Sequence, residues 1–145
     1  MKLDLRIFEG SGSGLTFDFL PLHNLDSSYD RNGPDRFFVR EEAFLFVEKG
    51  VAQVARDWLP YRHWSETILS RSEWLAVFDN LADLRADLSR SLPRRKLVER
   101  HLILPQFLPY KRKLDHLDML DFLERLERRV TSVLESYPHL IIAGI

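Results

Sequence analysis

The most constraining feature of this sequence is a leucine–acid repeat from Leu114 to Glu127 that leads into an apolar-periodic stretch ending at Tyr137. A strict three-residue repeat would wind around an α-helix, which has about 3.6 residues per turn. At about 100° per residue, however, most of the apolar residues share one broad stripe, and Leu114 and Leu117 fall outside it. The stripe contains Met119, Leu120, Phe122, Leu123, Leu126, Val130, Val133, Leu134 and Tyr137. The pattern predicts a long helix over about 115–137 that packs against a core.

The polar face of this helix supports the same prediction. Its acids come first and its arginines later, which suits the helix dipole. Asp121 with Arg125, and Glu124 with Arg128, are favourable pairs four residues apart.

Composition predicts one soluble globular domain over residues 1–145. The chain is 45% hydrophobic and 30% charged, which is typical of a folded protein rather than a disordered one. The net charge of −1 argues against a dedicated nucleic-acid binder. The absence of cysteine excludes a disulfide scaffold, thiolate metal sites and a cysteine nucleophile. Charges alternate through the N-terminal residues and no apolar run approaches about 20 residues, so we expect a cytoplasmic protein.

The N-terminal residues predict a β-hairpin. Leu3, Leu5 and Ile7 alternate with charged residues, and residues 15–19 repeat the alternation after the glycine-rich segment 10–14. Such a segment can also cradle phosphate, but that use requires a helix directly after it. Because a strand pattern follows here, we expect a turn.

Two further helices are predicted in the middle of the chain. The first covers about 40–58, with a short strand expected just before it at Phe37–Val39. The second covers about 71–90 and begins at a capping box formed by Ser70 and Glu73. Residues 94–104 fit either a short helix or a strand, and residues 140–145 fit a buried strand joining the hairpin. The expected fold is therefore α+β, a small antiparallel sheet of the N-terminal hairpin and the C-terminal strand, packed against about three amphipathic helices.

No motif for catalysis, cofactor binding or metal binding is present. The five histidines do not form the His-Glu-x-x-His pair that presents two metal ligands on one helix face. The segment 10–14 lacks the Gly-x-Ser-x-Gly pattern because position 12 is glycine. We therefore expect a protein without enzymatic activity, cofactor or metal.

An acidic row marks a candidate surface for a protein partner. Asp79, Asp83 and Asp87 stand four residues apart on the expected solvent side of the 71–90 helix, where like charges repel by about 0.2–0.5 kcal/mol per pair. Such a row either is tolerated in solvent or receives a basic partner.

Trp58, Tyr61 and Trp64 crowd a connection that would otherwise be polar. These residue types are enriched at interface hot spots, and they equally suit a plug between two helices. The sequence leaves both interpretations open.

A basic segment suggests an alternative function. Residues 94–113 carry seven cations, interleaved with Phe107 and Tyr110: Arg94, Arg95, Lys96, Arg100, Lys111, Arg112 and Lys113. Cations with stacking aromatics are typical of single-stranded nucleic-acid binding, whereas flanking charge runs more commonly solvate helix ends.

The order of elements resembles the small α+β immunity proteins of bacterial polymorphic toxin systems. The resemblance lies in the layout: the strand at 15–20, the helix from 40–44, the capped helix at 70–90, the late helix and the terminal strand at 141–145. It implies a cytoplasmic inhibitor that binds and neutralises a cognate toxin, and it transfers no functional residue. Our hypothesis is a non-catalytic protein-binding module of this type, possessing a basic protein partner. The alternative is a small regulatory protein that contacts RNA or DNA through residues 94–113.

Overall fold

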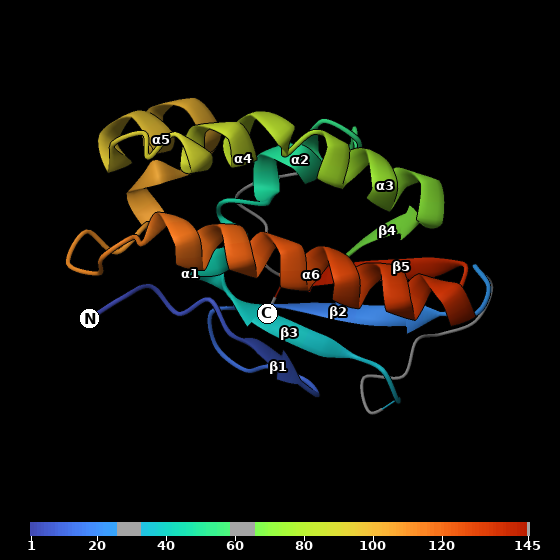
Figure 1. Cartoon of the computed structure of the whole chain (residues 1–145). Coiled ribbons are helices and arrows are strands. Elements are labelled where there is room, and N and C mark those ends of the chain that lie inside the picture. The colour runs from blue at the N-terminus through green and yellow to red at the C-terminus, as the bar shows by residue number, and fades with distance from the viewer. Residues whose placement is uncertain (26–32, 59–65, 145) are drawn as a thin grey trace.

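The computed structural model describes residues 1–25, 33–58 and 66–144 and confirms an α+β fold. The helices stack on one face of an antiparallel sheet (Figure 1). The strands are β1 (Ile7–Glu9), β2 (Thr16–Leu22), β3 (Phe37–Arg40), β4 (Glu66–Ser70) and β5 (His139–Gly144). The helices are α1 (Glu41–Phe44), α2 (Glu48–Ala52), α3 (Arg71–Asp79), α4 (Ala82–Ser89), α5 (Arg94–His101) and α6 (His116–Ser136), with a short 3-10 turn, η1 (Pro105–Phe107).

The sheet order β1-β3-β2-β5-β4 shows that the predicted N-terminal hairpin is wrong. Strand β3 lies between β1 and β2, and Val39 faces Ile7 on one side and Phe17 on the other. Pairing β1 directly with β2 would require a shorter loop than the observed arrangement. With a neighbouring strand on each side, however, β3 has its Phe37 and Val39 side chains completely buried. The short strand expected at 37–39 is confirmed as β3, and its position in the sheet is what the sequence did not predict.

The glycine-rich segment is therefore a crossing between separated strands. The Gly12 amide donates to both carboxylate oxygens of the buried Asp18, each at 3.2 Å. A Cβ at position 12 would meet the Thr16 Oγ1 at 2.4 Å. The segment packs tightly on the sheet; the strand expected after it is confirmed as β2, whereas the expected hairpin turn is wrong.

The predicted C-terminal strand is confirmed as β5, which lies inside the sheet rather than at its edge. β5 pairs with β2 on one side and with β4 on the other. Leu140 and Ile142 face the main core, whereas Ile141 and Ala143 join Leu20 in a second cluster on the opposite face. Burial on both faces explains the continuous apolar run. Strand β4, which directly precedes the capping box, was not predicted.

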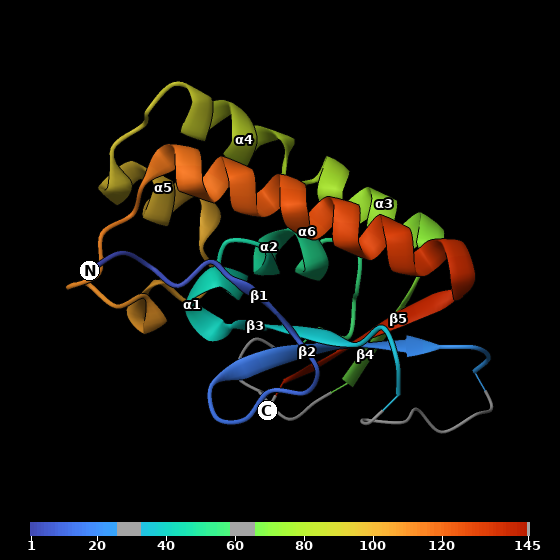
Figure 2. The same cartoon turned by 60° about the horizontal axis from the view of Figure 1, so that its bottom comes forward.

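Helix α6 confirms the prediction for residues 115–137. Asp115 caps it by accepting the Asp118 amide at 3.0 Å. The predicted stripe faces the core, and Leu117 is 76% exposed, as expected for a residue outside the stripe. Figure 2 shows α6 crossing the sheet with α3 and α4 beside it.

The two other predicted helices are broken. Residues 40–58 form the short helices α1 and α2, and residues 71–90 form α3 and α4. The predicted capping box begins α3, since the Glu73 amide donates to the Ser70 hydroxyl and the Ser70 amide donates to the Glu73 carboxylate. After α3, the Leu81 amide donates to the Phe78 carbonyl three residues back, at 3.1 Å. This tighter turn changes the direction of the residues that follow.

Gly50, in the middle of α2, is buried. A Cβ there would lie 2.9 Å from both the Val77 carbonyl oxygen and the Leu81 Cδ2. The missing side chain lets α2 approach α3 closely, so packing against a neighbouring helix outweighs the low helix propensity of glycine.

Residues 94–101 adopt the helical alternative as α5, and η1 follows it. In the part of the chain that is described, no helix is both long and apolar enough to cross a membrane.

Candidate functional site

The three aspartates of the expected acidic row do not lie on one surface. Asp79 and Asp83 are exposed, but Asp87 is only 1% exposed, so its predicted place on the solvent side is wrong. The physical reason is the packing of α5 against α4, because α5 side chains contact Asp87, whereas Asp83, one turn earlier on the same helix, stays exposed. Asp83 also borders a polar pocket of about 260 Å³ that Lys49 and Arg100 help to line.

Asp87 instead joins helices. Its Oδ2 lies 2.7 Å from the His101 Nε2 and 3.2 Å from the Arg100 Nη1, and Arg90 donates to its other oxygen. The hydrogen bond from His101 lowers the pKa of Asp87, and the two arginines act in the same direction. The cluster fastens α5 to α4.

The aromatic connection is described only at Trp58, since Tyr61 and Trp64 lie outside the described residues. The Trp58 ring is half-buried and packs near the rings of Phe44 and Phe17, with centroid distances of 5.6 and 6.4 Å. Its indole N–H donates to the Glu48 Oε2 at 3.3 Å. For Trp58, the core interpretation fits the structure.

Glu48 is a carboxyl group buried in the core. It is 1% exposed, and its Oε1 has no hydrogen-bond partner among the described residues. Burial raises the pKa of Glu48 to about 7, against the opposing hydrogen bond from Trp58, and the nearby Glu41 adds to the rise.

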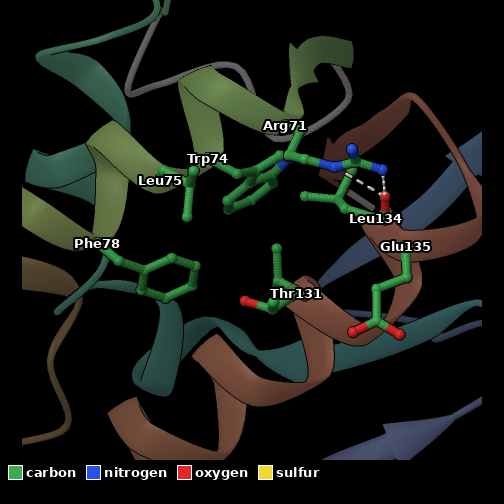
Figure 3. Close-up of a pocket in the computed structure, with 8 residues that line it drawn as sticks. Arg71, Trp74, Leu75, Phe78, Thr131, Leu134 and Glu135 are labelled. Carbon is green, nitrogen blue, oxygen red and sulfur yellow. Dashed lines mark hydrogen bonds between the residues drawn. The ribbon is translucent and has the colours of Figure 1, made fainter.

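An apolar groove lies between α3 and α6. It has a volume of about 400 Å³ and is lined by Arg71, Trp74, Leu75, Phe78, Val130, Thr131, Leu134 and Glu135. Figure 3 shows Trp74, Leu75 and Phe78 on one wall, with Thr131, Leu134 and Glu135 on the other. We call it the α3–α6 groove.

The groove has a buried floor and an exposed apolar edge. Trp74, Phe78 and Leu134 are buried, and the Trp74 indole donates to the Leu140 carbonyl at 3.2 Å. Arg71 bridges one end, where its Nε donates to the Leu134 carbonyl at 3.0 Å. Leu75, by contrast, is 54% exposed. Sequence reasoning missed this surface, although a leucine on the polar side of the predicted 71–90 helix was an available signal.

One acidic side chain lines the groove, and a second follows Leu75 on α3. Asp79 follows Leu75 by one helical turn on α3 and therefore shares its face. Glu135 lines the groove from α6 and is exposed. Of the expected acidic row, Asp79 is thus the residue that shares a helix face with Leu75.

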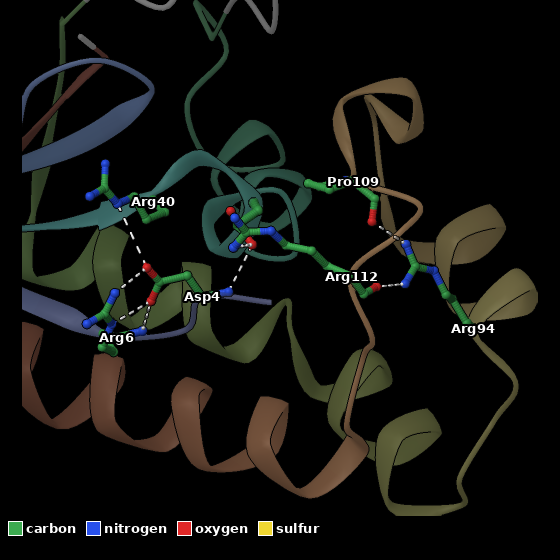
Figure 4. Close-up of polar contacts among 7 residues, drawn as sticks. Asp4, Arg6, Arg40, Arg94, Pro109 and Arg112 are labelled. Carbon is green, nitrogen blue, oxygen red and sulfur yellow. Dashed lines mark hydrogen bonds and ion pairs between the residues drawn. The ribbon is translucent and has the colours of Figure 1, made fainter. Parts of the chain in front are cut away.

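Several cations of the basic segment hold the fold together. Arg94 donates to the carbonyls of Pro109 and Arg112, and Arg112 itself pairs with Glu42 at 3.1 Å (Figure 4). Arg100 pairs with Asp87. The remaining cations, Arg95, Lys96, Lys111 and Lys113, are exposed.

The same close-up shows a second polar cluster near the N-terminus. Asp4 accepts two hydrogen bonds from the Arg6 guanidinium, at 2.9 and 2.8 Å, and lies 3.9 Å from Arg40 (Figure 4). The hydrogen bond from Arg6 lowers the pKa of Asp4. These contacts tie the N-terminal segment to β3.

Within residues 1–25, 33–58 and 66–144, no three histidine, aspartate or glutamate side chains gather as a metal site. No family model matches the chain, and comparisons with curated proteins and with solved structures give no match either.

Proposed function

We propose that this chain is a non-catalytic protein-binding module that acts in the cytoplasm as an immunity-type inhibitor. It binds a basic surface of a toxin domain and neutralises it. The observation that carries the proposal is the α3–α6 groove, where an exposed leucine and an apolar floor stand beside the exposed Glu135, with the exposed Asp79 one helical turn after Leu75 on α3.

The chemistry of the groove suits a partner that presents an apolar side chain next to a lysine or arginine. The apolar side chain enters between Leu75 and Thr131, and its burial against Trp74 and Phe78 slows dissociation. The cation approaches Asp79 and Glu135, and their charge accelerates association. An inhibitor needs only to cover its target, so no catalytic group is required.

The buried Asp87–His101 pair does not favour an enzyme over this proposal. A carboxylate that orients a catalytic histidine can occur in a triad. Here, Asp87 also forms ion pairs with Arg90 and Arg100. Arg100 and His101 connect α4 to α5, whereas Arg90 lies at the end of α4 itself. Their evident effect is to fix the position of helices.

Site-specific photocrosslinking tests the proposal. The photoreactive residue p-benzoylphenylalanine would replace Leu75 in one variant and Leu117 in a control, because both leucines are exposed and lie toward opposite ends of the helical layer. After irradiation in cells that express the chain, we expect one basic protein to crosslink at position 75 and not at position 117. The purified partner should form a stoichiometric complex and lose its toxic activity.

Three results would contradict the proposal. Equal adducts at both positions would show that the groove is not the binding surface. Crosslinks from position 75 to many unrelated proteins would indicate nonspecific binding. A partner whose activity is unchanged in the complex would exclude inhibition.

A further inference from the structure

Tertiary contacts bring together two basic runs that are separate in the sequence. Arg94, at the start of α5, donates through Nη2 to the Pro109 carbonyl at 3.0 Å and through Nη1 to the Arg112 carbonyl (Figure 4). Residues 94–96 therefore lie against the turn that carries residues 109–113. The Lys113 amide also donates to the Met1 carbonyl at 2.8 Å, which holds this turn from the other side.

On the combined surface, the basic side chains outnumber the acidic side chains that pair with them. Glu99 pairs with Arg95 at 3.2 Å, and Glu42 pairs with Arg112 at 3.1 Å. Lys96, Lys111 and Lys113 are exposed, and none of them lies within 4.0 Å of a carboxylate in the described part of the chain.

An exposed aromatic ring lies among these cations. Tyr110 is 83% exposed, and the Lys111 Nζ lies 5.8 Å from the centre of its ring. Phe107, on the adjoining 3-10 turn, is also exposed. We call Arg95, Lys96, Tyr110, Lys111 and Lys113 the basic–aromatic patch.

We propose that the basic–aromatic patch binds single-stranded nucleic acid. Lysines contact the phosphates, while an exposed ring stacks on a base that duplex pairing would otherwise hide. An acidic protein surface would satisfy the lysines but has no comparable use for Tyr110. The patch lies by the start of α6 and the groove by its end, so the two surfaces are separated by most of a 21-residue helix, roughly 30 Å long.

Fluorescence anisotropy with a labelled 15-nucleotide oligothymidylate, and with the matching oligouridylate, tests this binding. Contacts with about three phosphates predict that affinity falls about 20-fold between 50 and 200 mM salt. The double variant Lys111→Gln/Lys113→Gln should reduce this fall to about threefold. Tyr110→Leu keeps an apolar side chain but removes the ring, and it should weaken binding about tenfold.

Two exposed arginines away from the patch, Arg56 and Arg128, provide matched controls. Their glutamine variants should bind the oligonucleotides as the unchanged protein does. Leu75→Ala should also leave this binding unchanged, which separates the patch from the groove of the proposed function.

The proposal is overturned if neither oligonucleotide binds in 50 mM salt, or if the control variants lose as much affinity as the lysine variant. Polyglutamate provides a further discriminating probe. If it binds as tightly as the oligonucleotides and Tyr110→Leu leaves all affinities unchanged, the patch recognises acidic polymers by charge alone and not nucleic acid.

Discussion

The Asp87 carboxylate and the His101 imidazole lie 2.7 Å apart across the α4–α5 junction, although 14 residues separate them in the sequence. Both side chains are buried, and Arg90 and Arg100 supply further hydrogen bonds to the same carboxylate. Lys49 adds a connection from α2, since its Nζ donates to the Arg100 carbonyl at 2.7 Å. The position of α5 thus depends on a polar cluster as well as on apolar packing.

Asp87→Asn should lower the melting temperature by several degrees, because the variant leaves His101, Arg90 and Arg100 without their shared anion. The pKa of Asp87 is lowered from 3.8, so its stabilising effect is present above that pH and is lost as pH falls through the folded-state pKa. Denaturant unfolding at pH 7, 5 and 3 gives the free energy of unfolding of both proteins. The variant should be less stable than the unchanged protein at pH 7 and 5, and this difference in free energy should become smaller only at pH 3. Asp83→Asn, at an exposed site, serves as the control. Equal melting temperatures of the two variants would contradict the stabilising role of Asp87.

Glu48→Gln should remove a pH dependence of stability. The folded-state pKa of Glu48 is raised from 4.5 to about 7, so its contribution is full below 4.5 and is lost as pH rises to 7. This loss amounts to at most about 3 kcal/mol, and the glutamine variant should not show it. Unfolding free energies measured between pH 4 and 8 check the difference between the two proteins, with the exposed Glu66→Gln as a control.

A second variant tests the cause of the Glu48 behaviour. Trp58→Phe keeps a ring against Phe44 but removes the hydrogen bond that opposes the rise in the pKa of Glu48. The pH at which stability is lost should therefore move upward. A midpoint that stays in place, or moves down, would show that the indole does not act on this carboxyl group.

Gly50→Ala should destabilise the fold even though alanine favours helices by up to about 1 kcal/mol. Its methyl group would lie 2.9 Å from the Val77 carbonyl oxygen, which is backbone and cannot move without shifting α3. We expect a net loss of about 1–3 kcal/mol, the usual range for overpacking. Urea unfolding measures it, and a variant as stable as the parent would refute the close approach of α2 and α3.

Asp79→Asn/Glu135→Gln should slow association with the partner identified by crosslinking and weaken the salt dependence of that rate. Stability should change by no more than about 0.5 kcal/mol, because both side chains are exposed. Stopped-flow association at two ionic strengths gives the comparison. Asp83→Asn should reduce the association rate less, since Asp83 borders a different pocket. An equal reduction would show that the partner binds at α4 and not at the groove.

Local patterns predicted the elements whose structure depends mainly on neighbouring residues. The apolar stripe of residues 119–137 was enough to place α6, because the spacing of side chains around a helix follows from its backbone geometry. The Ser70–Glu73 capping box likewise located the start of α3, since its hydrogen bonds span only three residues. The apolar run at 140–143 indicated a buried strand for the same local reason.

Tertiary structure decided the features that require distant residues to meet. The insertion of β3 between β1 and β2 depends on Val39 burying itself against both Ile7 and Phe17. The buried position of Asp87 depends on partners at the end of α4 and on α5, up to 14 residues away in the sequence. The α3–α6 groove exists because residues more than 50 positions apart, on α3 and on α6, pack side by side, leaving Leu75 at its edge. Periodicity records which face of one element is apolar, but it contains no information about which other element covers that face.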